Sequence, residues 1–122
     1  MVIENIAKPL AESYKALLSE FRPDWDVEIR IGDYNLYKLG FVNEIPCSLC
    51  LTVSDEQLQE LQDALYELEA DAYSCEEYLA KRPVRMTEEE KTIRKTAREH
   101  QARYRKYAPL EAVCNYWMYQ RS

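Results

Sequence analysis

The stretch SDEQLQELQDALYELEADAYSCEEYLA, from Ser54 to Ala80, decides most of the fold that we expect for this chain of 122 residues. Ser54 and Gln57 have the spacing of a capping box, in which two side chains satisfy backbone N–H groups at the start of a helix. Apolar residues then recur at alternating steps of three and four, the pattern of a helix with one buried seam: Leu58, Leu61, Leu65, Leu68, Ala72, Cys75 and Leu79. These features predict a helix about 39 Å long.

The residues that follow are predicted to return along this helix as a second one. Pro83 ends the first helix, and Thr87 with Glu90 forms another capping box. The expected seam of the second helix comprises Ile93, Ala97, His100, Tyr104 and Tyr107. A link of about seven residues favours an antiparallel αα-hairpin. Pro109 then begins a short last helix, whose inward face is expected to carry Leu110, Val113, Cys114, Trp117 and Met118.

Before the hairpin, the hydrophobic period changes from helical to extended. A helix is expected from Pro9 to about Phe21, and it is stopped by Pro23. Alternating apolar residues then predict strands over residues 27–31, 36–42 and 45–53. The connections between them are short, so we expect a three-stranded antiparallel β-meander.

These elements predict an α+β fold with the order α-βββ-α-α-α. The length suits a single domain over residues 1–122. Within it, residues 9–53 form the helix and meander, residues 54–108 the charged αα-hairpin, and residues 109–122 the C-terminal helix.

The composition argues against an enzyme. The chain has two glycines, too few for a glycine-rich phosphate loop or a dinucleotide fingerprint. His100 is its one histidine, and we expect it to be buried on a helix seam rather than to act as a catalytic base. We predict no catalytic residues and no cofactor, although a cysteine nucleophile remains an alternative.

Cys47 and Cys50 form the one recognisable motif, a pair of cysteines three residues apart. Residues three apart on a strand point to opposite faces, so the two sulfurs should diverge instead of sharing a metal ion. We expect Cys47 in the core, Cys50 on the opposite face, and no metal site. A zinc-stabilised module stays open as an alternative.

The chain is expected to be cytoplasmic and not to bind membranes. The residues Met1-Val2-Ile3-Glu4 contain neither the basic nor the apolar part of a secretory signal. No stretch approaches the roughly 18 apolar residues of a membrane-spanning helix. In that compartment, all four cysteines should remain reduced.

The net charge of −6 conceals a strong separation of charge. Nine acids and no base lie between Asp55 and Glu77, whereas ten bases and four acids lie between Lys81 and Lys106. One interpretation is that the two arms of the hairpin neutralise each other. The other is that an acidic face is displayed for a partner.

Five of the acids recur at steps of four, three, four and four and therefore share one helix face: Glu56, Glu60, Asp63, Glu67 and Asp71. Their axial spacing of about 4.5–6 Å resembles that of phosphates along a nucleic-acid strand. Such a row can occupy a basic groove built for nucleic acid. In predicted layout the chain resembles small phage-type inhibitors that use this mimicry, including some anti-CRISPR proteins. We therefore predict a non-enzymatic acidic protein that inhibits or regulates a protein partner, most sharply a nucleic-acid-handling one.

Three further binding surfaces follow from the sequence. Tyr116 and Tyr119 belong to an aromatic cluster of the kind found at protein interfaces, and we include both as candidate partner-binding residues. The basic arm could contact nucleic acid directly, but the acidic balance of the chain argues against it. A structural or adaptor protein that forms a homodimer through the Leu58–Leu79 seam is the remaining alternative.

Overall fold

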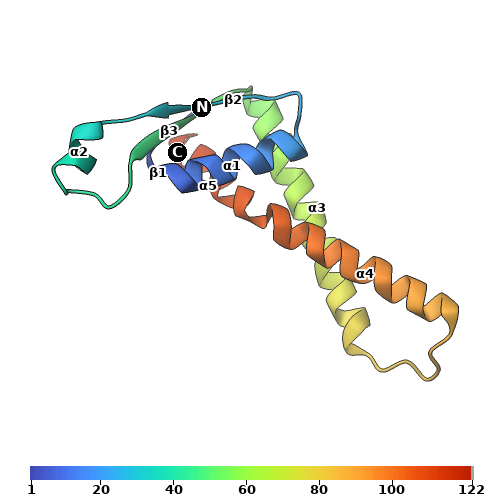
Figure 1. Cartoon of the computed structure of the whole chain (residues 1–122). Helices are drawn as coiled ribbons and strands as arrows, with labels where there is room; N and C mark the ends of the chain where they lie inside the picture. The colour runs from blue at the N-terminus through green and yellow to red at the C-terminus, as the bar shows by residue number, and fades with distance from the viewer. Residues whose placement is uncertain (122) are drawn as a thin grey trace.

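The computed structural model describes residues 1–121 and combines a small sheet with a long helical hairpin (Figure 1). In chain order the elements are β1 (Val2–Ala7), α1 (Lys8–Phe21), β2 (Asp26–Ile31), α2 (Tyr34–Lys38), β3 (Pro46–Thr52), α3 (Asp55–Ala80), α4 (Glu88–Tyr107), the 3₁₀ turn η1 (Ala108–Leu110) and α5 (Glu111–Arg121). The α+β class, the first helix, the hairpin and the last helix are confirmed. Met118, which was expected on the inward face of the last helix, is exposed instead.

The sheet is antiparallel, but it is not the meander that the sequence predicted. Its strand order is β1-β3-β2, so β3 lies between two strands that precede it in the chain. Two of the predicted strands, 27–31 and 45–53, correspond to β2 and β3. The third strand of the sheet is β1, which the sequence analysis did not identify.

The predicted strand over residues 36–42 is wrong, because that segment connects β2 to β3 and contains the short helix α2. The Asp33 side chain caps α2 by accepting a hydrogen bond from the Asn35 N–H at 3.0 Å. Gly40 then turns the chain with φ of +82°, a conformation that glycine adopts without strain. β2 pairs directly with β3, so this segment has no strand neighbour that would keep it extended.

The sequence did not predict β1, because the buried residues of this strand do not alternate with exposed ones. Its pairing with β3 shifts between Ile3 and Ile6, and Asn5 within that interval has φ of 57°. This irregularity puts Ile3 and Ile6, three residues apart, on the buried face. A period of three in a short segment does not indicate a strand.

The hydrophobic core lies between one face of the sheet and the helices. The sheet contributes Ile3, Val27, Leu49 and Leu51, and α1 covers them with Ala11, Tyr14 and Leu18. The first half of α3 and the inner face of α5 complete the cluster with Leu58, Leu61, Leu65, Val113, Cys114 and Trp117. Helices therefore cover one face of the sheet, and they place the acidic part of α3 at the edge of the body.

The helical hairpin projects from this body (Figure 1). Both hydrogen bonds of the predicted capping box at Ser54 and Gln57 are present. Only half of the box predicted at Thr87 and Glu90 is found: the Thr87 side chain accepts the Glu90 N–H, whereas the Thr87 N–H donates to the Arg85 carbonyl. The α3 seam is buried in the core at its start, and farther along it packs against α4. A homodimer through the Leu58–Leu79 seam stays a prediction.

The seam predicted for α4 needs correction at two positions. Ile93 is 44% exposed and His100 is also exposed, whereas Arg94 and Ala97 are buried. The two helices cross (Figure 1). Near the start of α4, Glu90 accepts a hydrogen bond from the Tyr78 hydroxyl of α3 at 2.7 Å, and the Arg94 side chain donates to the Lys81 carbonyl at the carboxyl end of α3. An arginine at a buried position does not register in a hydrophobic pattern.

Candidate functional site

The acidic ridge, which we define as Glu56, Glu60, Asp63, Glu67 and Asp71, lies on the solvent side of α3. All five side chains are exposed, whereas the apolar seam of the same helix faces the core and α4. The ridge extends for about 22 Å along the helix axis. Glu60 pairs with Arg22 at 3.4 Å, and Asp63 accepts a hydrogen bond from the Gln59 amide at 3.0 Å. Solvent-exposed contacts of this kind leave the carboxylates accessible to a partner.

Direct pairing between the two arms of the hairpin does not balance this charge. Lys106 pairs with Glu20 of α1, and Arg94 pairs with Glu90 of its own helix. Within residues 1–121, no ion pair joins a carboxylate of α3 to a base of α4. Both helices therefore present charge to solvent, negative on α3 and positive on α4.

Two tyrosines that the sequence analysis missed also stand on the exposed side of α3. Tyr66 is 72% exposed and Tyr73 is 64% exposed. Helical geometry puts Tyr66 roughly 60–100° around the axis from Asp63 and Glu67. Tyr66 and Tyr73 are seven residues apart and lie outside the apolar seam, so the sequence already places both on one exposed side of the helix.

Tyr116 and Tyr119 lie on α5, whereas the acidic ridge lies on α3. They are 41% and 81% exposed, and with Ala112 and Asn115 they line a shallow apolar depression. Asn115 also lines a cleft between α3 and α5 that includes Tyr66. Asn115 is therefore common to the depression that holds the α5 tyrosines and to the cleft that holds Tyr66.

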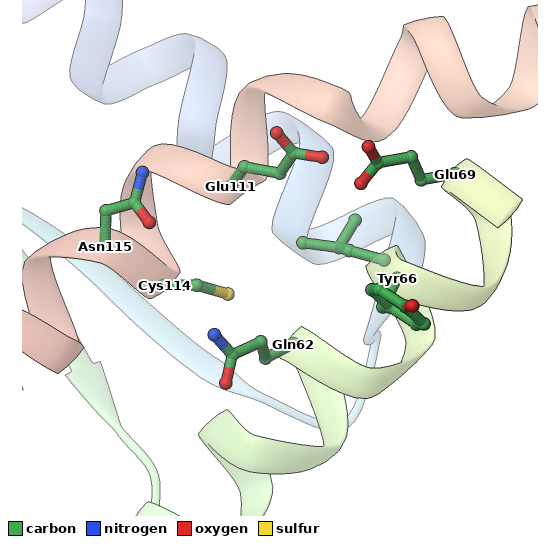
Figure 2. Close-up of a pocket in the computed structure, with 7 residues that line it drawn as sticks. Gln62, Tyr66, Glu69, Glu111, Cys114 and Asn115 are labelled. Atoms are coloured by element: carbon green, nitrogen blue, oxygen red, sulfur yellow. The ribbon is translucent and has the colours of Figure 1, made fainter.

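The cleft between α3 and α5 brings together acidic, amide, aromatic and thiol side chains (Figure 2). It is lined by Gln62, Leu65, Tyr66 and Glu69 from α3, and by Glu111, Cys114 and Asn115 from α5. Glu111 accepts a hydrogen bond from the Tyr104 hydroxyl at 3.1 Å. Burial, and secondarily the nearby Glu111 carboxylate, raise the pKa of Cys114 to about 11. This thiol is protonated at neutral pH, the opposite of an activated nucleophile.

The histidine lies on a different surface. Exposed His100 lines a separate depression on α4 with Thr96, Glu99 and Arg103, so it is not the buried residue that the sequence predicted. None of these neighbours is a cysteine. The described chain therefore does not bring His100 and Cys114 together as a base and a nucleophile.

Cys47 and Cys50 lie on opposite faces of β3. Cys47 is 1% exposed in the core, and Cys50 lies partly exposed on the opposite face of β3, which confirms the predicted divergence. All four thiols are free. In the part of the chain that the structure describes, no three His, Cys, Asp or Glu side chains are grouped so that they could hold a metal ion.

Comparisons with protein-family models, curated proteins and solved structures find no match to this chain. No helix among the described residues has the length and apolar character needed to cross a bilayer. The surface features that could bind a partner are the acidic ridge, the basic side of α4 and the exposed tyrosines of α3 and α5.

Proposed function

We propose that this chain is a non-enzymatic binding protein that inhibits or regulates a nucleic-acid-handling protein, with the acidic ridge on α3 as its contact surface. The observation that carries the proposal is the exposure of all five ridge carboxylates on one side of α3, without direct ion pairs to α4. A basic groove that accepts a phosphate strand would attract such a row by the same charge complementarity.

The rigidity of α3 supports this role. Its capping box, its buried Leu58, Leu61 and Leu65, and its packing against α4 hold the carboxylates on one continuous helix. A partner would not have to order the ridge on binding, so less of the interaction energy would be lost as conformational entropy. The layout no longer supports the resemblance to phage-type inhibitors, because the observed sheet is not a three-stranded meander. The support for the proposal comes from the acidic ridge itself.

The clefts favour binding over catalysis. The Cys114 thiol holds its proton at neutral pH, and His100 lies elsewhere. Tyr66 and Tyr73 flank the ridge with large exposed rings, which are typical of residues that anchor protein interfaces. Tyr116 and Tyr119 would extend the contact only for a partner that also reaches α5.

The test is a triple charge reversal, Glu56→Lys, Glu67→Lys and Asp71→Lys. These residues have no ion pair within the described chain, so their reversal should leave the fold intact. Tagged protein is used to capture partners from its native host, and captured complexes are challenged with duplex DNA and with RNA. We expect the wild-type chain to capture one or more proteins that added nucleic acid displaces. The triple variant should fail to bind these proteins.

The matched control reverses Glu4, Glu44 and Glu89, which are exposed residues away from the ridge. Both triple variants change the net charge from −6 to zero, so a difference between them reports position rather than overall charge. Equal binding by the two variants would contradict the ridge as the contact surface. Binding that nucleic acid does not displace would contradict nucleic-acid mimicry.

A second candidate is direct binding of nucleic acid through α4, because its bases are not occupied by the acids of α3. Lys95, Arg98 and Arg105 are exposed on one side of α4. Direct binding predicts that the chain shifts a labelled duplex or single strand at low salt, and that reversing these three bases to glutamate abolishes the shift. An unshifted probe at low salt would exclude this candidate.

A further inference from the structure

The two edges of the sheet differ in a way that points to a second copy of this chain. The β1 edge is interrupted at Asn5, and the Gln120 amide donates a hydrogen bond to the Val2 carbonyl at 2.8 Å. Both features protect an edge from further pairing. Among residues 1–121, β2 is regular over Asp26–Ile31 and has a strand neighbour on one side only.

The register between β2 and β3 decides which backbone groups of β2 point outward. The Gly32 N–H donates to the Pro46 carbonyl at 2.8 Å, so this position is a hydrogen-bonded pair. Such pairs alternate along an antiparallel ladder. Glu28 and Arg30 therefore bond to β3, whereas the N–H and C=O groups of Val27, Ile29 and Ile31 face the open edge.

The hydrogen bond of the Leu51 N–H independently supports the outward direction of the Val27 backbone groups. It donates to the Met1 carbonyl at 2.8 Å, on the β1 side of the central strand. Its neighbour on the other side, Val27, is consequently not hydrogen-bonded to β3. The outward direction of the Val27 N–H and C=O groups follows from both observations.

The side chains of β2 are self-complementary about Ile29. In an antiparallel pair of two β2 strands centred there, Val27 lies opposite Ile31 of the second copy, and the outward backbone groups match. Glu28 of each copy then lies opposite Arg30 of the other. These are non-hydrogen-bonded pairs, in which the side chains are close together. The neighbouring registers with matching hydrogen bonds would place Glu28 opposite Glu28, or Arg30 opposite Arg30. Within one chain Arg30 pairs with Glu28 at 3.1 Å, so each β2 edge carries one such ion pair. The register centred on Ile29 sets the two ion pairs against each other with opposite charges facing, whereas the neighbouring registers set like charges against each other.

An exposed apolar lobe adjoins the same edge. We define it as the large hydrophobic residues of the β2–β3 connection, with the end of β2: Ile31, Tyr34, Leu36, Tyr37, Leu39, Phe41 and Val42. Leu39 is 69% exposed, Phe41 is 74% exposed, and α2 lies beyond the end of the sheet (Figure 1). Patches of this kind mark interaction surfaces. Antiparallel pairing would bring the lobe of each copy alongside the start of β2 in the other.

We propose that this chain forms a symmetric dimer by antiparallel β2–β2 pairing about Ile29, which makes one continuous six-stranded sheet. Backbone hydrogen bonds from Val27, Ile29 and Ile31 join the copies, and the Glu28 and Arg30 pairs set the register. The apolar lobes flank this ladder. The interface is separate from the acidic ridge on α3, so a dimer would present two ridges.

The experiment measures the mass of the full chain by analytical ultracentrifugation over a wide range of concentration. The expected species is twice 14.5 kDa. Arg30→Glu places like charges opposite each other at two symmetric positions, which should raise the dissociation constant at least about tenfold. The double variant Glu28→Arg, Arg30→Glu exchanges the charges and should restore the dimer. Lys15→Glu, an exposed change of equal charge on α1, should leave the mass distribution unchanged.

Ile31→Pro provides a second disruption that does not depend on charge. It removes an N–H that points away from β3, so the sheet within one copy keeps its hydrogen bonds. We expect this variant to be monomeric. Hydrogen exchange gives the residue-level signature: the amides of Val27, Ile29 and Ile31 should become protected as concentration rises, whereas those of Glu28 and Arg30 stay protected throughout.

A wild-type mass of 14.5 kDa at every concentration would overturn the proposal. A dimer that neither Arg30→Glu nor Ile31→Pro weakens would overturn it equally, because another surface would then hold the copies together. The acidic-ridge variants of α3 should dimerise normally. Failure of the ridge proposal is therefore distinguishable from failure of this one.

Discussion

Arg94 holds the far end of the helical hairpin together, and replacing it with alanine should destabilise the protein measurably. The side chain is 8% exposed, and it donates hydrogen bonds to Glu90 at 3.0 Å and to the Lys81 carbonyl at 2.7 Å. A longer contact reaches the Leu79 carbonyl at 3.4 Å, and the guanidinium lies 5.3 Å from the centre of the Tyr78 ring. These carbonyls are at the end of α3, where no further helical turn can satisfy them.

The expected loss follows from the contacts. Hydrogen bonds to a charged group are worth about 1.5–3 kcal/mol each, but water can partly replace those at the half-buried end of a hairpin. We therefore expect Arg94→Ala to cost about 2–3 kcal/mol in the free energy of unfolding. For a chain of this size, that loss lowers the melting temperature by about 10 °C.

The assay is urea and thermal unfolding followed by circular dichroism, with hydrogen exchange to localise the effect. Arg98→Ala is the matched control, because Arg98 is exposed on the same helix and should change stability by less than about 0.5 kcal/mol. Amides on both sides of the link from α3 to α4 should exchange faster in the Arg94 variant. Equal stability of the two variants would refute the role of Arg94 as a clamp.

Two further predictions concern the cleft and the start of α3. The pKa of Cys114 is about 11 in the folded protein, whereas that of an ordinary thiol is 9.0. The buried, protonated thiol therefore contributes fully to stability below pH 9. As the pH rises from 9 to 11, the free energy of unfolding should fall by up to about 2–3 kcal/mol. In the Cys114→Ala variant, the free energy of unfolding should fall less steeply between pH 9 and pH 11 than in the wild type. The same pH dependence in both proteins would contradict this prediction. Ser54→Ala removes the hydroxyl that accepts the Gln57 N–H at 3.1 Å and should cost about 1 kcal/mol in urea unfolding. The exposed Ser74→Ala on the same helix is its control, and an equal effect of both changes would count against the cap.

The helical half of the fold could be predicted because its signals are local. The capping residues Ser54 and Thr87 and the stop at Pro83 each act within one or two helical turns. The apolar seam of α3 repeats over many turns, so its buried side could be identified as well. The register of α4 could not, because Arg94 is buried through contacts with carbonyls of another helix.

The sheet was harder to predict because its pairing is not local. The paired residues of β1 and β3 are 39 to 48 positions apart in the chain, and a shift in register near Asn5 removes the alternation that identifies a strand. Residues 36–42 alternate in hydrophobicity, yet they have no strand to pair with. Hydrophobic period alone cannot distinguish a strand from an exposed apolar connection.

The sequence by itself determined where the charge is, because helical spacing alone puts the five acidic-ridge residues on one face of α3. It also determined that Cys47 and Cys50 diverge, because side chains alternate along a strand. Only the tertiary structure decided that the ridge faces solvent instead of the bases of α4, since that depends on how two helices cross. It likewise decided that β2 has an open edge, because strand order is set by pairing between residues distant in the chain.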